Sequence, residues 1–178
     1  MGRQFFVTPV EPLHSAGGLS YNTSVTLTDV STLPQITIGG YTLTIGTKVR
    51  ARAAGFFSNT GTPTLLLGFY YGGVAGLALA ASSAITTTTG AASWPFIMEY
   101  SGTVRTIGAT GTIIGSGKLY LGTALTAFTI RPILEVAANR TVTIDTTVSK
   151  TLTVGAQWGT SSASNALVCD ELLVELIN

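Results

Sequence analysis

Charged side chains are scarce in this chain of 178 residues. Only 10% of its residues are Asp, Glu, Lys or Arg, against about 25% in an average soluble domain. Nine basic and eight acidic residues leave a formal net charge of +1, which argues against a nucleic-acid partner or a polybasic membrane-surface protein. Hydrophobic residues make up 46% of the chain, the opposite of the composition of a disordered segment. The chain is therefore expected to fold, with a polar surface supplied by its 30 Thr and 14 Ser rather than by ions.

Cysteine and histidine are also nearly absent, with one of each, Cys169 and His14. A single cysteine excludes an intrachain disulfide framework and a multi-cysteine metal site. His14 lies in a segment rich in proline and glycine, which offers no stable scaffold for a Ser-His-Asp triad. We therefore predict no catalytic residue, no metal and no cofactor, and expect that the chain is not an enzyme. The first residues contain no apolar run or cleavage site typical of a signal peptide, so classical secretion is not expected.

The few charges gather in two clusters. In the run from Lys48 to Ala53 basic and apolar residues alternate, which puts every basic side chain on one face of a strand. Three carboxylates lie within six positions near the C-terminus. We predict that these clusters form ionic contacts across neighbouring strands or across a subunit boundary, rather than the carboxylate pair of a glycosidase. The candidate residues for this ionic register are Lys48, Arg50, Arg52, Asp170, Glu171 and Glu175.

No charged residue occurs between Arg52 and Glu99, so residues 53–98 form a long uncharged run. Its most apolar part, Thr64 to Ala81, is close to the shortest length of a membrane-spanning helix. It contains four glycines and lacks the flanking Lys/Arg asymmetry of membrane helices. We therefore favour two buried sheet strands joined by a turn at Tyr70-Tyr71-Gly72-Gly73, and expect no membrane partner.

Short strands account for most of the remaining sequence. Alternation of apolar and polar residues, or a short apolar run between turn residues, marks each one. The pair Gly39-Gly40 predicts a hairpin between two of them. The expected strands are Phe5–Thr8, Ser24–Thr28, Gln35–Ile38, Tyr41–Ile45, Lys48–Ala53, Thr64–Tyr71, Val74–Ala80, Pro95–Ile107, Gly111–Leu121, Phe128–Val136, Val142–Asp145, Thr151–Trp158 and Asn165–Ile177.

These strands predict an all-β fold. About ten short strands separated by polar turns favour an antiparallel β-sandwich, and the jelly roll is the commonest topology of this size. Residues 1–22 are expected to form an extended N-terminal arm, and residues 23–178 a single domain. The C-terminal run has enough apolar residues for a helix, but its apolar even positions favour a strand, with Asp170 as the exception.

The two tryptophans, Trp94 and Trp158, lie beside predicted turns and are candidate aromatic anchors. An exposed tryptophan at such a place can stack on a sugar ring. More often a lone tryptophan there anchors a core or an interface. Both alternatives stay open from the sequence alone, with the structural one favoured.

Several motifs resemble those of bacteriophage virion proteins. The first is Lys48 to Gly73 (KVRARAAGFFSNTGTPTLLLGFYYGG), in which a GTPTL turn precedes a strand that ends in GG. The others are Trp94 to Tyr100 (WPFIMEY), Thr103 to Thr112 (TVRTIGATGT) and Ala156 to Asn165 (AQWGTSSASN). The resemblance covers roughly residues 41–177. It implies a jelly-roll head, similar in shape to the heads of tumour necrosis factor and C1q, that assembles as a homotrimer.

The resemblance also implies a role on the virion. We expect a capsid decoration or cement protein, made in the host cytoplasm, that binds the major capsid protein or another virion protein and stabilises the assembled head. The alternative is a tail-fibre or spike head that binds a host receptor or glycan. The chain lacks repeats, heptads and a collagen-like tract from which a fibre shaft could be built, which favours decoration. In the predicted arm, the candidate shell-binding residues are Arg3, Phe5, Phe6 and His14.

Overall fold

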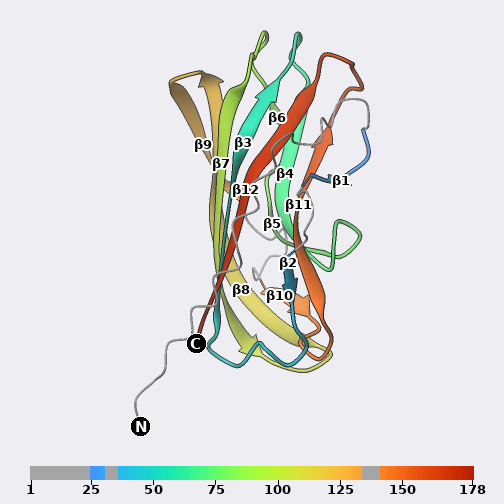
Figure 1. Cartoon of the computed structure of the whole chain (residues 1–178), viewed down its shortest axis with the longest axis vertical. Helices are drawn as coiled ribbons and strands as arrows, with labels where there is room; N and C mark the ends of the chain where they lie inside the picture. Colours follow the sequence, from blue (N-terminus) through green and yellow to red (C-terminus); the bar gives the residue numbers. More distant parts are fainter. Residues whose placement is uncertain (1–24, 31–35, 134–140) are drawn as a thin grey trace.

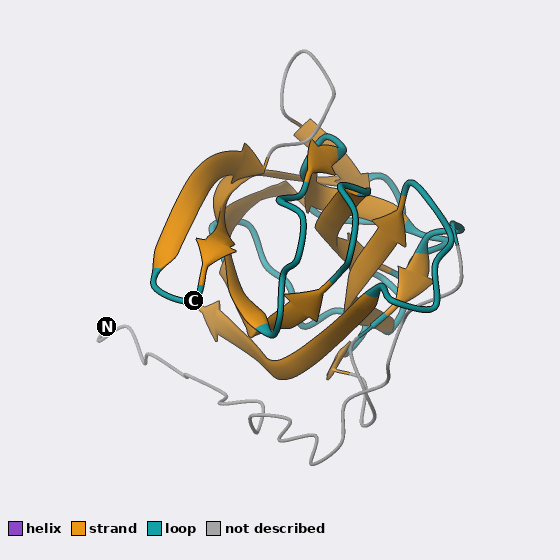
Figure 2. Ribbon diagram, turned by 90° about the horizontal axis from the view of Figure 1, so that it is seen from above, coloured by secondary structure: helices purple, strands orange, loops and turns teal. Residues whose placement is uncertain are grey.

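The structure, a computed structural model, describes residues 25–30, 36–133 and 141–178, and this part of the chain contains twelve strands and no helix. The strands form two antiparallel sheets of six strands each, which lie against each other as two layers (Figure 1). Seen along the long axis, the layers surround a common interior (Figure 2). The predicted all-β antiparallel sandwich is confirmed, with twelve strands where about ten were expected. The expected arm over residues 1–22 and its strand Phe5–Thr8 lie outside the described residues.

The first sheet consists of β1 (Thr28–Asp29), β2 (Ile36–Ile38), β4 (Thr64–Tyr71), β5 (Leu77–Ala81), β6 (Ile85–Thr86) and β11 (Lys150–Trp158). Its order is β1-β11-β4-β5; β2 also pairs with β11, and β6 with β4. The second sheet consists of β3 (Lys48–Ser58), β7 (Trp94–Thr106), β8 (Gly111–Ala124), β9 (Ala127–Ile133), β10 (Thr141–Ile144) and β12 (Ala166–Ile177). Its order is β10-β8-β7-β3-β12, and β9 also pairs with β8.

The last strand, β12, returns to lie beside β3, the first long strand. The resulting order β12-β3-β7-β8 puts the final strand next to β3, and β4, β5 and β6 of the first sheet separate β3 from β7 in the chain. Because β3 and β12 are far apart in sequence, this return brings the N-terminal basic cluster and the C-terminal acidic cluster to adjacent strands.

Alternating residues of both sheets form one core between the layers. In β3, Val49, Ala51 and Ala53 are buried while the basic residues between them face outward. The largest completely buried side chains are those of Trp158, Phe57, Phe69 and Phe96. This period of two is the geometry of a strand with one face in the core, and it fixes which face each charged residue occupies.

The uncharged segment from Thr64 to Ala81 forms β4, a turn and β5, as the sequence predicted. Gly72 and Gly73 have φ of 91° and 76°, a backbone conformation that favours glycine, so the strand expected from Val74 begins only at Leu77. No helix in the described part of the chain is long and apolar enough to cross a membrane.

Residues 41–45 are a loop, so the predicted strand Tyr41–Ile45 and the hairpin at Gly39-Gly40 are wrong. Tyr41 has φ 61° and Gly46 has φ 92°, which interrupts the extended backbone at both ends. The Thr47 hydroxyl accepts a hydrogen bond from the Thr44 N–H at 3.0 Å, a local bond that competes with strand pairing. Only Leu43 of the expected apolar face is buried.

One expected strand is much shorter than predicted, one is much longer, and one strand was not predicted. The strand expected at Lys48–Ala53 continues to Ser58 as β3. The strand expected at Ser24–Thr28 is reduced to the two residues of β1, because only Thr28 and Asp29 pair with β11. Conversely, β6 lies at the start of a threonine tract for which no strand was predicted, and it pairs with the beginning of β4. Such short edge strands depend on their partner strand rather than on their own residue pattern.

Threonine and asparagine side chains connect the loops at one end of the sandwich. Asn59, only 3% exposed, donates from Nδ2 to the Thr87 hydroxyl at 2.8 Å, and its Oδ1 accepts from the Ala91 N–H at 3.3 Å. The Thr87 hydroxyl donates in turn to the Pro63 carbonyl at 2.7 Å. Each bond satisfies a buried polar group, so part of the high threonine content serves the loops.

Candidate functional site

The pairing of β3 with β12 brings together the two charged clusters that stood out in the sequence. Arg50 lies directly opposite Glu175. Arg52 lies opposite Leu173, whose nearest neighbours on the same face of β12 are Glu171 and Glu175. All these side chains point away from the core, because they alternate with the buried Val49 and Ala51 of β3. Five of the six predicted ionic residues therefore lie in register on one outer sheet face, whereas the sixth, Asp170, has no residue opposite it in β3.

A β-bulge determines which acidic residues face outward. Cys169 pairs with Gly55 and Glu171 pairs with Ala54, so Asp170 is an extra residue in β12. Before the bulge Leu167 and Cys169 face the core, and after it Leu172 and Val174 do. The sequence pattern predicted that the even-numbered residues of this strand face the core. This holds only after Asp170, which is itself the one charged residue among those even-numbered positions.

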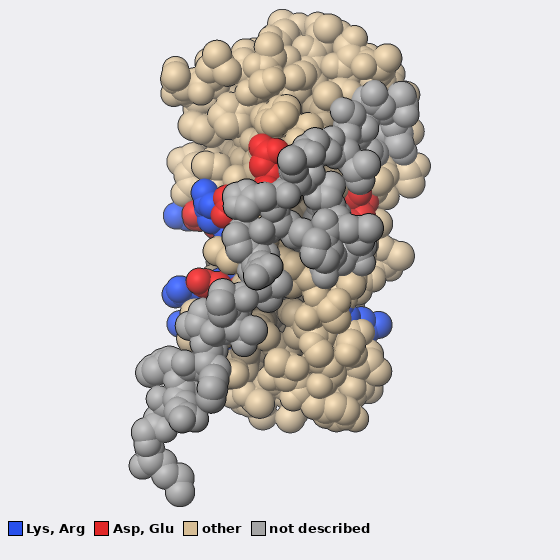
Figure 3. Space-filling view, in the orientation of Figure 1, with Lys and Arg blue, Asp and Glu red and all other residues tan. Residues whose placement is uncertain are grey.

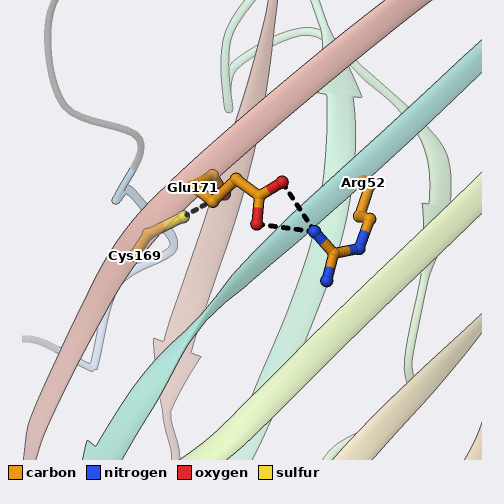
Figure 4. Close-up of polar contacts among 3 residues, drawn as sticks. All are labelled: Arg52, Cys169 and Glu171. Atoms are coloured by element: carbon orange, nitrogen blue, oxygen red, sulfur yellow. Dashed lines mark hydrogen bonds and ion pairs between the residues drawn. The ribbon is translucent and has the colours of Figure 1, made fainter. Parts of the chain in front are cut away.

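Arg52 and Glu171 form an ion pair across the two strands (Figure 4). The Arg52 Nη1 donates to both carboxylate oxygens of Glu171, each at 2.6 Å. The side chains remain 41% and 29% exposed, and an exposed pair contributes under about 1 kcal/mol to stability. The pair therefore orients two side chains on the sheet face more than it stabilises the fold.

The thiol of Cys169 lies beside this pair but on the core side. It donates a weak hydrogen bond to the Glu171 carbonyl oxygen, with Sγ at 3.4 Å (Figure 4). Burial raises the pKa of the thiol to about 12, because the thiolate would lose its hydration. A thiol in this state is a poor nucleophile, so Cys169 is a core residue.

Two more charged residues, which the sequence pattern did not indicate, extend the same face. Glu99 of β7 lies opposite Arg52, and Lys118 of β8 lies opposite Glu99. Their signal in the sequence was weak, because neither belongs to a local cluster of charges. Only the pairing of four strands aligns them with the residues of β3 and β12. We define the charged band as Lys48, Arg50, Arg52, Glu99, Lys118, Glu171 and Glu175.

The charged band holds seven of the thirteen charged residues in the described part of the chain. On the face drawn in Figure 3, charged atoms lie at mid-height and both ends of the molecule are free of them. The low overall charge is thus distributed unevenly, with most of it on one strip of the second sheet.

Most charges in the band have no intrachain ion pair. The pair between Arg52 and Glu171 is the one ion pair within 4.0 Å among residues 25–30, 36–133 and 141–178. Glu99 lies between Arg52 and Lys118 in register but forms no such pair with either. The ionic groups of Arg50, Glu99, Lys118 and Glu175 are therefore available to a partner.

A shallow hollow of about 460 Å³ lies within the charged band. Small residues in the middle of β7 and β8 form its floor, including Ser101, Ser116 and Gly117. Longer charged side chains surround them. The lining residues with charged groups are Arg50, Arg52, Glu99, Lys118 and Glu175. The hollow thus offers both donors and acceptors, together with room for an incoming side chain.

Beside the charged band, the outer face of the second sheet becomes apolar. The residues there alternate with core residues and so point outward. Phe128 and Ile130 of β9 are 44% and 59% exposed, and Ile130 lies opposite Tyr120, which lies opposite Ile97. We define the apolar patch as Phe56, Pro95, Ile97, Tyr120, Phe128 and Ile130. Apolar surface that continues across four strands marks an interaction site more often than isolated apolar residues do.

The outer face of the first sheet is different, because the chain covers its middle with its own residues. Tyr70 and Thr153 point to this face, yet they are only 6% and 0% exposed. A methyl group on Gly155 would come within 2.6 Å of the Tyr70 ring and 3.0 Å of Val74, so these side chains lie over the strand at that point. The open sheet face is therefore that of the second sheet.

A second hollow, of about 420 Å³, lies between the loops at one end of the sandwich. Hydroxyl and amide side chains dominate its lining, and no charged residue contributes to it. One of them, Asn165, is held by the hydrogen bond from its Nδ2 to the Thr160 carbonyl at 2.8 Å. The lining residues are Thr60, Gly61, Thr62, Pro63, Thr160, Ser161, Ser162 and Asn165.

The remaining predicted residues are distributed as follows. Trp158 is completely buried, and Trp94 packs edge-on against Phe57, with ring centroids 6.4 Å apart. Both tryptophans therefore contact the core, and neither contributes to the hollows. The predicted shell-binding residues Arg3, Phe5, Phe6 and His14 lie outside the described residues.

Within the described ranges, no group of three or more His, Cys, Asp or Glu side chains is close enough to hold a metal ion. The arrangement on the second sheet offers charges of both signs next to apolar surface, which are the components of a protein interface. No protein-family model, curated protein or solved structure matches the chain.

Proposed function

We propose that this chain is a structural protein of a bacteriophage particle, a trimeric capsid decoration or cement protein that binds and stabilises the assembled head without catalysing a reaction. The phage context rests on the sequence motifs described above. The observation that carries the structural role is the outer face of the second sheet, where most of the charge and a continuous apolar patch lie together. A surface of this kind binds another protein surface.

In this proposal the protein acts by binding alone. Apolar sheet surface holds the copies of the chain together, and the predicted arm, with Arg3, Phe5, Phe6 and His14, contacts the shell. A ligand that binds only the assembled shell stabilises it by mass action, because each occupied site lowers the free energy of the assembled state. The major capsid protein or another virion protein is the expected partner.

The position of the protein on purified particles tests the role directly. Electron microscopy of the particles is expected to show this chain at regular positions on the head. If it occurs only at the tail tip, the decoration role is wrong. A second measurement adds purified protein to heads that lack it and records the temperature at which they open, which is expected to rise with protein concentration and then level off.

A truncation tests the role of the arm. Removal of residues 1–22 is expected to leave the thermal unfolding of the domain unchanged and to abolish binding to heads in a sedimentation assay. Full binding by the truncated chain would contradict the arm as the shell contact. The matched control is the full-length chain measured at the same concentration.

A second candidate function, a tail-fibre or spike head that binds a host glycan, has support from one feature. The hollow between Thr60 and Asn165 is lined by hydroxyl and amide groups, which can exchange hydrogen bonds with sugar hydroxyls. It contains no aromatic ring on which a sugar could stack, so decoration remains the preferred proposal. Binding of the isolated protein to host-cell surface polysaccharide, together with a tail location, would favour the glycan role.

A further inference from the structure

We propose that copies of this chain bind one another through the outer face of the second sheet. In this contact, the half of the face formed by β12 and β3 of one copy lies against the half formed by β7, β8 and β9 of the next. This inference rests on the proposed self-association and names the residues responsible for it. The occupant of the face is a second copy of the chain.

The apolar patch supplies the attraction. Ile130 and Phe128 are 59% and 44% exposed in the single chain, and Phe56 and Pro95 lie next to each other on the neighbouring strands. Burial of such side chains is favourable in proportion to the apolar area removed from water. The first sheet has no equivalent open face, since Tyr70 and Val74 cover its middle.

The charged band supplies complementarity between the two halves. The β12 and β3 half carries Glu175 and Arg50, neither of which forms an ion pair with another residue in the described part of the chain. The β7 and β8 half carries Glu99 and Lys118, which also lack one. Within the charged band, the β12 and β3 half thus presents two unpaired cations, Lys48 and Arg50, and one unpaired anion, and the β7 and β8 half presents one of each. Arg50 of one copy can pair with Glu99 of the next, and Glu175 can pair with Lys118.

Cyclic symmetry about an axis parallel to the strands places the facing residues of two copies at the same level along the strand direction. An axis parallel to the strands, whether two-fold or three-fold, brings one half of the face against the other half of a neighbour without a shift along the strands. The patch residues of β7, β8 and β9 then meet Phe56 and the adjoining end of β3 in the neighbouring copy, and charged band meets charged band. An axis perpendicular to the strands would instead bring charged residues against apolar ones, which costs free energy through desolvation.

The hollow in the band provides room for the contacts. Its floor at Ser101, Ser116 and Gly117 is low because these residues are small. A charged side chain from the neighbouring copy can therefore enter between the longer side chains and reach an ionic group of opposite sign. Such pairs also oppose misaligned association, because a shifted copy would bring like charges together.

Charge reversal tests the pairing. We expect Arg50→Glu and Glu99→Arg each to weaken self-association at least about tenfold, measured by light scattering over a concentration series at physiological salt. The matched control is Lys150→Glu, which makes the same charge change on the first sheet. Circular dichroism of each variant checks that the sheets still form.

Mixing the two variants separates an interface effect from a folding effect. In an equimolar mixture, Glu at residue 50 of one variant meets Arg at residue 99 of the other, so opposite charges face each other again. A mixed trimer restores its two contacts between unlike variants and keeps one contact between like variants, so we expect oligomers to reappear in part in the mixture although each variant alone dissociates. A mixture that stays monomeric contradicts the proposed contact.

The apolar patch is tested with Ile130→Ser, for which Ile45→Ser is the control. Ile45 is similarly exposed, at 67%, but lies in the loop before β3. We expect Ile130→Ser to weaken association and Ile45→Ser to leave it unchanged. If the native chain is oligomeric and none of Arg50→Glu, Glu99→Arg and Ile130→Ser weakens association, this inference is overturned while the proposed function stands. If the native chain is an 18.3 kDa monomer at every concentration, the proposed trimer itself is wrong.

Discussion

Arg52 of β3 and Glu171 of β12 face each other because β12 contains one residue more than the regular pairing requires. The extra residue is Asp170, and the register resumes at Glu171. Without the bulge, strict alternation after the inward-facing Cys169 would turn Glu171 into the core and Leu172 outward. The bulge therefore keeps both the ion pair on the surface and the apolar residues in the core.

Two single-residue deletions test the role of the bulge. Deletion of Asp170 removes the extra residue and leaves Glu171 outside and Leu172 inside. Deletion of Leu173 moves Val174 out of the core and turns Glu175 inward. We expect the Leu173 deletion to lower the free energy of unfolding by roughly 3 kcal/mol more than the Asp170 deletion, since it buries an unpaired carboxylate. Denaturant unfolding of both variants measures the difference, and equal losses would contradict the role of the bulge.

A double-mutant cycle measures the contribution of the ion pair. Arg52→Gln, Glu171→Gln and the double variant are expected to give a coupling energy under about 1 kcal/mol, because both side chains remain partly exposed to solvent. The coupling should shrink further in 1 M salt, where the Debye length is about 3 Å. A coupling of several kcal/mol in denaturant unfolding would show that the pair is desolvated and structurally essential.

Gly55 is expected to be intolerant of a side chain. A methyl group at this position would come within 1.9 Å of the Val168 carbonyl oxygen, a backbone atom at the bulge. We expect Gly55→Ala to lower the free energy of unfolding by about 2 kcal/mol or more, because the two strands must separate locally. The control is Gly61→Ala, where nothing lies within 4 Å of the added methyl. Chemical denaturation of the two variants tests this, and a Gly55→Ala protein as stable as the control would contradict it.

The buried thiol predicts a loss of stability at alkaline pH. Burial raises the pKa of Cys169 to about 12 from the ordinary value of 9.0. The contribution of the neutral thiol to stability is therefore complete below pH 9 and is lost as the pH rises from 9 toward 12, because only the unfolded chain ionises there. We expect the free energy of unfolding to fall by up to about 1.4 kcal/mol per pH unit from this group.

The variant Cys169→Ala should lack this component of the alkaline fall, although it will be less stable at neutral pH because it leaves a cavity. Alkylation provides an independent check on the cause. At pH 8 the native thiol should react with iodoacetamide far more slowly than the thiol of the unfolded chain. Equal rates would mean that the thiol is accessible in the native state and that burial does not raise its pKa.

Much of the fold was predictable from local pattern. The strand Thr64–Tyr71 was predicted with its exact limits, because its apolar residues end at a pair of glycines. The segment 41–45 shows the same kind of alternation, yet it is a loop, because Tyr41 and Gly46 adopt positive φ and Thr47 bonds locally. Alternation shows that a segment can have one buried face, but it does not show whether a partner strand is present.

The candidate site was predictable only in part. The sequence showed the basic residues of β3 and the acidic residues near the C-terminus as clusters, since each cluster is local in the chain. Glu99 and Lys118 belong to the same band but lie in separate strands, outside any local cluster of charges. Exposed apolar residues such as Ile130 could not be distinguished from core residues, because the pattern of a strand does not say which of its faces a second sheet covers.

The sequence by itself determined that the chain forms short strands and that its charges are few and clustered. These properties follow from composition and from the two-residue period of a strand, both of which are local. The tertiary structure alone decided that β12 pairs with β3, that a bulge turns Glu171 outward, and that the second sheet keeps an open face. Strand pairing is a long-range choice made by the packing of the whole core, so the surface proposed here for self-association exists only once all the strands are in register.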